Sequence, residues 1–63
     1  MYQLLVYYPD TKGVVATIDA RSAVDVLELI PKILSDHEGC EHVVVMFNSV
    51  RLFAVDCAGN RLP

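Results

Sequence analysis

The segment YQLLVYYPDTKGVVATI, residues 2–18, decides the fold, because it places two strand-forming runs around a turn. Residues 2–8 and 14–18 are rich in aromatic and β-branched side chains, which favour strands. The Pro-Asp-Thr-Lys-Gly sequence between them is typical of turns, since proline presets φ, aspartate bonds its own backbone and glycine accepts a positive φ. These residues therefore predict a β-hairpin at the start of the chain.

A helix follows the hairpin. Ser22 is a suitable N-cap, and Gly39 is a natural stop signal. Pro31 interrupts the helical pattern and would cost ~3 kcal/mol in a straight helix, so we expect a kink or a break near residues 29–32. The apolar residues recur at helical spacing. The predicted buried stripe is Ala23, Val26, Leu27, Ile30, Ile33, Leu34 and His37.

A second hairpin is predicted after the helix. VVVMF at residues 43–47 forms one strand and residues 50–56 form the next, with Asn48-Ser49 as a two-residue turn. The tail from residue 61 is expected to fray. The predicted fold class is α+β: a two-layer ββαββ domain spanning residues 1–63, with a mainly antiparallel four-stranded sheet and one helix on one face.

Alternation along the strands sorts the sheet into two faces. The face under the helix is expected to contain the cross-strand pairs Val6–Ala16, Leu4–Ile18, Val45–Leu52 and Val43–Ala54. The opposite face should be mostly polar if water covered it, yet it is apolar, aromatic and Met- and Arg-containing, as protein interfaces are. The predicted interface residues on this open face are Leu5, Tyr7, Val15, Val44, Met46, Arg51, Phe53 and Val55.

Composition narrows the possible partners. The chain has 63 residues, 54% of them hydrophobic, and a net charge of −3. Its five basic residues are scattered, which argues against direct nucleic-acid binding. The apolar runs are shorter than the ~18 residues of a spanning helix, and the N-terminus does not resemble a signal peptide. We expect a cytoplasmic protein with no membrane contact and with Cys40 and Cys57 reduced, a disulfide between them being the less favoured interpretation.

Only one group of residues resembles a metal site. His37, Cys40, His42 and Cys57 would supply two nitrogens and two sulfurs to zinc. Their spacing lacks the paired CxxC and HxxxH motifs of zinc knuckles. A cysteine nucleophile would need a base and an orienting group, and buried inert thiols are commoner. The sequence predicts no catalytic residue, no bound metal and no cofactor.

The favoured interpretation is a small non-enzymatic protein-binding module, homodimeric through the open face, which binds and modulates or inhibits another protein. A two-fold self-contact is the commonest oligomer, but the same apolar face would serve a different partner. In build alone the chain is similar to the small inhibitors that phages and mobile elements direct at host complexes, such as anti-CRISPR proteins. The alternative is a small zinc-binding domain using His37, Cys40, His42 and Cys57.

Overall fold

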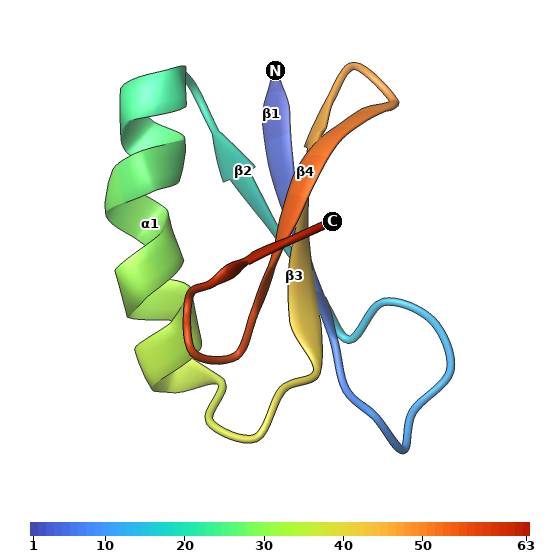
Figure 1. The fold of residues 1–63 in the computed structure, drawn as a ribbon. Coiled ribbons are helices and arrows are strands. Elements are labelled where there is room, and N and C mark those ends of the chain that lie inside the picture. The colour runs from blue at the N-terminus through green and yellow to red at the C-terminus, as the bar shows by residue number, and fades with distance from the viewer.

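In the computed structural model, which describes residues 1–63, one helix packs on one face of a five-stranded antiparallel sheet (Figure 1). The strand order is β2-β1-β3-β4-β5, so α1 carries the chain from one side of β1 to the other. The predicted α+β class is confirmed. The elements in chain order are β1 Tyr2–Tyr7, β2 Ala16–Ala20, α1 Ala23–Asp36, β3 His42–Phe47, β4 Val50–Asp56 and β5 Arg61–Leu62.

The fifth strand was not predicted, because the tail was expected to fray. β5 pairs with Ala54 and Val55 of β4. The turn before it is held by the Asp56 carboxylate, which accepts hydrogen bonds from the backbone N–H groups of Ala58 and Asn60, both at 2.9 Å. Gly59 supplies the positive φ of 88° that this turn requires.

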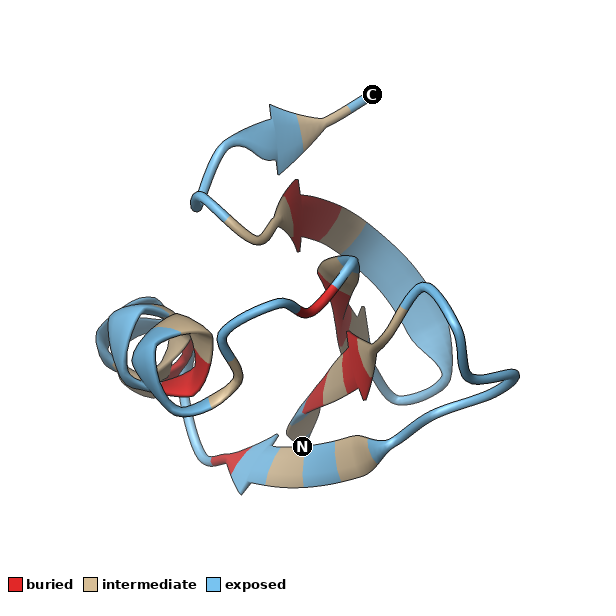
Figure 2. Ribbon diagram, turned by 90° about the horizontal axis from the view of Figure 1, so that it is seen from below, coloured by how far each residue is buried: buried red, intermediate tan, exposed pale blue.

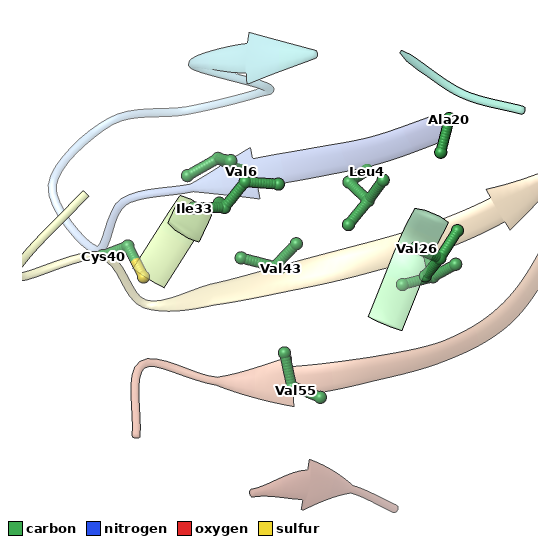
Figure 3. Packing of buried hydrophobic residues seen from close by; sticks show 9 residues of the cluster. Leu4, Val6, Ala20, Val26, Ile33, Cys40, Val43 and Val55 are labelled. Carbon is green, nitrogen blue, oxygen red and sulfur yellow. The ribbon is translucent and has the colours of Figure 1, made fainter. Parts of the chain in front are cut away.

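The first hairpin has the predicted register. Val6 pairs with Ala16 and Leu4 pairs with Ile18. On its other side β1 pairs with β3, which places Leu4 opposite Val45 and Val6 opposite Val43. The side chains of Leu4, Val6, Val43 and Val45 are completely buried in the core between the sheet and α1. Figure 3 shows three of them, Leu4, Val6 and Val43, in this core.

The second hairpin begins as predicted and then changes register. Asn48 and Ser49 both have positive φ, as a two-residue hairpin turn requires, and Phe47 pairs with Val50. A β-bulge follows, in which Leu52 is the extra residue between the paired residues Arg51 and Phe53. The predicted pairs Val45–Leu52 and Val43–Ala54 are therefore wrong. Val45 pairs with Phe53, and Val43 pairs with Val55.

The bulge moves two predicted interface residues to the other side of the sheet. Because side chains alternate, one extra residue exchanges the faces of everything that follows it. Val55 belongs to the buried core, and Phe53 packs against that core beside α1. The placement of Phe53 and Val55 on the open face is thus corrected. Ala54, expected under the helix, lies on the open face opposite Val44.

α1 begins where predicted and runs through Pro31 without a break. The backbone N–H of Asp25 donates to Ser22 Oγ at 3.2 Å, which caps the first turn. Pro31 has no N–H to donate to the Leu27 carbonyl. Both residues are exposed, so water can donate a hydrogen bond to that carbonyl instead. The expected break is absent.

No helix of the chain has the length and apolar content that spanning a bilayer requires.

The apolar stripe of α1 is wider than the surface it buries. Val26 and Ile33 are buried, whereas Leu27 is 65% exposed and Ala23 is also exposed, contrary to prediction. The turn before β5 covers part of the C-terminal half, because a Cβ at Gly59 would lie 3.5 Å from Leu34 Cδ1. No comparable loop covers Leu27.

Two valines of β4 test the register. We expect Val55→Ala to lower the free energy of unfolding by about 2 kcal/mol, because Val55 is buried in the core. Val50→Ala, in the same strand but 60% exposed, should change it by less than about 0.5 kcal/mol. Urea unfolding of both variants gives the comparison. Equal losses would contradict the bulged register.

Candidate interaction surfaces

The open face of the sheet holds most of the predicted interface. Cross-strand pairing places Leu5 beside Val44, and Met46 beside Arg51, on the side away from α1. Tyr7 lies on the same side opposite His42, and Val15 lies just outside the start of β2. Six of the eight predicted residues are therefore grouped on or near this face.

The open face nevertheless exposes less apolar surface than predicted. Val44 is only 8% exposed and Ala54 only 1%, although no helix lies over them. Val44 sits between Leu5 on β1 and Ala54 on β4, and Leu62 of β5 is the partner of Ala54. Directly opposite side chains in an antiparallel pair cover one another, so the central part of this face is shielded by its own neighbours.

One end of the open face is polar. The rings of Tyr7 and His42 stack with centroids 4.7 Å apart and planes 10° from parallel. His42 Nδ1 lies 3.3 Å from Glu41 Oε1, and Asp56 is the cross-strand partner of His42. This end of the open face is therefore more polar than the mixed apolar, aromatic and arginine-containing face that the sequence predicted.

The four residues considered for zinc do not come together. His42 lies on the open face, whereas His37 extends from the end of α1 and its Nδ1 hydrogen bonds with the Tyr8 hydroxyl at 3.1 Å. The chain contains no group of three or more His, Cys, Asp or Glu side chains arranged to hold a metal. The structure therefore does not assemble the N2S2 site.

Two members of that group do meet. Cys40 is 5% exposed within the core cluster, and the half-buried Cys57 packs against it. Burial, together with the contact with the Cys57 thiol, raises the pKa of Cys40 from 9.0 to about 11. Both thiols are free. The sequence grouped these two cysteines only as possible zinc ligands, because their direct contact depends on how the ends of β3 and β4 align.

A second apolar surface was missed altogether. Between the N-terminal half of α1 and strand β4 lies a hollow of about 180 Å³, hereafter the apolar groove. Every residue that lines it is apolar or aromatic. These residues are Tyr2, Ala23, Val26, Leu27, Val45, Leu52 and Phe53.

Exposed apolar side chains continue beyond the apolar groove. Val24 and Val50 are more than half exposed. The ring of Phe47 packs against the ring of Tyr2, with their centroids 4.7 Å apart. The Arg61 guanidinium lies 4.8 Å from the centre of the Phe53 ring. The width of the apolar stripe on α1 was the available signal, since one helix on a sheet buries only an arc of its surface.

The opposite flank of α1 has a different character. A hollow of about 270 Å³ between the helix and the end of β2 is lined mainly by charged side chains of both signs. The lining residues are Asp19, Ala20, Arg21, Asp25, Glu28, Leu29 and Lys32. Of the two hollows beside α1, only the one that faces β4 is lined wholly by apolar and aromatic side chains. Figure 2 shows the exposed outer side of α1 and its buried side toward the sheet.

The Cys40 thiol should make stability depend on alkaline pH. Its pKa is higher in the folded chain than the ordinary 9.0, so its contribution is complete below pH 9 and is lost as pH rises through about 11. We expect the free energy of unfolding, measured with a phosphine reductant, to fall over this interval more steeply for the natural chain than for Cys40→Ala. Parallel curves would contradict the shift.

Comparison of the chain with protein-family models, with curated proteins and with solved structures found no match.

Proposed function

We propose that this chain is a small non-enzymatic protein-binding module that docks through the apolar groove. The observation that carries the proposal is the concentration of exposed apolar side chains on both walls of the groove. Leu27 on α1 is 65% exposed and Leu52 on β4 is 44% exposed. Exposed apolar patches of this kind mark interaction sites, because burying them against a partner is favourable relative to leaving them in water.

The exposed area suits a protein partner. Val24, Leu27, Phe47, Val50 and Leu52 together expose on the order of 500 Å² of largely apolar surface, against ~800 Å² per partner in a standard interface. The aromatic rings of Tyr2 and Phe53, which line the groove, add rigid contact surface, and aromatic residues are enriched at binding hot spots. The patch would thus supply the apolar centre of an interface with a polar rim.

A second copy of the chain is the partner that we favour. β5 pairs only with Ala54 and Val55, so the outer edge of β4 at residues 50–53 has no strand beside it. The bulge at Leu52 twists this edge and opposes regular strand pairing, so the contact would be made by the exposed side chains of the groove. A two-fold axis beside this edge would bring the two apolar grooves together.

The groove is favoured over the open face for self-contact because its side chains are more exposed. In such a dimer the open faces stay outside, with Tyr7, Met46 and Arg51 available to a different protein. Arg51 lies beside Met46, with Tyr7 farther along the same face, and arginine, methionine and tyrosine are enriched at binding surfaces. The module would act in the cytoplasm by occupying, and so modulating or inhibiting, that second protein.

Charge substitutions at the groove test the proposal. We expect the chain to be a dimer by light scattering, and Leu27→Asp and Leu52→Asp each to raise the dimer dissociation constant at least tenfold, since a buried unpaired carboxylate opposes association. Val14→Asp is the matched control: Val14 is 44% exposed, as Leu52 is, but lies in the loop before β2.

The outcomes separate the two surfaces. A natural chain that stays monomeric at all concentrations would reject self-association. A dimer that is broken by Leu5→Asp but not by Leu52→Asp would assign the contact to the open face. Circular dichroism of each variant checks that the helix is retained.

A further inference from the structure

We propose that Cys40 and Cys57 form a reversible dithiol–disulfide pair, oxidised within one chain by a low-molecular-weight disulfide. The pair lies at the end of the molecule where α1 meets β3 and where β4 leads into the turn before β5. It is independent of the apolar groove and of the proposed dimer.

The alignment of two strands brings the cysteines together. His42 and Asp56 are the last paired residues at this end of the β3–β4 hairpin. Cys57 follows Asp56 directly, and Cys40 lies two residues before His42. Both belong to one apolar cluster, and their thiols are close enough to interact. Continuing that register places Cys57 opposite Glu41, so Cys40 is its diagonal neighbour, one residue along the strand direction. A disulfide needs Cα atoms within about 7 Å.

Backbone hydrogen bonds hold both cysteines in place. The N–H of Cys40 donates to the His37 carbonyl at 3.1 Å, and the N–H of Glu41 donates to the Tyr7 carbonyl at 2.8 Å. On the other side, the N–H of Asp56 donates to the Asn60 carbonyl at 2.8 Å. The two thiols are therefore presented to each other by ordered segments, which lowers the entropy cost of closing the bond.

Exposure sets the order of reaction. Cys57 is half-buried and Cys40 is almost fully buried, so the Cys57 thiolate is the one that reaches a dissolved disulfide. Its sulfur attacks one sulfur of the oxidant, the S–S bond of the oxidant breaks, and one small thiolate leaves. Cys57 then carries a mixed disulfide.

Cys40 completes the exchange. After its proton passes to water, the Cys40 sulfur attacks the Cys57 sulfur, and the second small thiolate leaves. The protein dithiol has lost two electrons and the small disulfide has gained them, giving two small thiols. Part of the raised Cys40 pKa comes from Cys57 itself, and a Cys57 sulfur in a mixed disulfide carries no charge to oppose this ionisation.

The disulfide would stabilise the end of the molecule where the β3–β4 hairpin meets the C-terminal end of α1. It closes the β3–β4 hairpin and ties the loop after α1 to the turn that packs Gly59 near Leu34. We expect oxidation to raise the melting temperature by on the order of 10 °C, the shift typical for a native-geometry disulfide in a small domain. A chain of 63 residues, with a small core, would gain a large fraction of its stability this way.

The test incubates the purified full chain in reduced and oxidised glutathione at set ratios. Mass spectrometry after alkylation should find loss of two hydrogens and a Cys40–Cys57 linked peptide within a single chain. The Cys40→Ser variant should stop at a glutathione adduct on Cys57. Calorimetry of the oxidised natural chain should give the higher melting temperature.

Either of two results would overturn the proposal. The first is a folded chain that keeps both thiols, or that forms only glutathione adducts and disulfides between chains. The control is the urea-unfolded chain, which the same buffer must oxidise. The other is an oxidised chain that melts no higher than the reduced one, which would mean that the bond distorts the hairpin. Because both measurements use the natural sequence, they stand even if Cys40→Ser fails to fold.

Discussion

The extra residue at Leu52 is the constraint on which both the core and the candidate surfaces depend. A β-bulge at this position turns Phe53 and Val55 toward α1 and leaves Ala54 on the open face. Without it, the second half of β4 would place a small alanine under the helix and a phenylalanine in water. The bulge therefore improves the packing of the central sheet, and it also places Leu52 and Phe53 in the wall of the apolar groove.

The number of layers explains why apolar surface is left over. One helix has to cover five strands, and its buried contact is concentrated at Val26 and Ile33. The turn before β5 extends the cover over the C-terminal half of α1, where Gly59 approaches Leu34. The N-terminal half has no such cover, so Ala23 and Leu27 stay exposed beside β4. An interface at this position would complete a core that the chain is too short to close alone.

The two features of interest occupy opposite ends of the core. Figure 3 shows Val26, which lines the apolar groove, at one end and Cys40 at the other, with Val43 between them. The proposed self-association at the groove and the proposed oxidation of the thiols would therefore involve different strand ends and different loops. Each can change without direct contact with the other, so their tests are separate.

Local sequence determined the elements: alternating and β-branched runs gave the strands, Ser22 started the helix, and Asn48-Ser49 turned the second hairpin. The register of the first hairpin also followed from the apolar alternation of its strands, although the connection runs over residues 8–15 and not over the expected residues 9–13. Tertiary structure alone decided the bulge, the fifth strand, the exposure of Leu27 and the meeting of Cys40 with Cys57. These four features depend on how β4 packs against α1 and on which strand ends align. The periodicity of the sequence reports which face a residue lies on, but it carries no information on the distance between residues far apart in the chain.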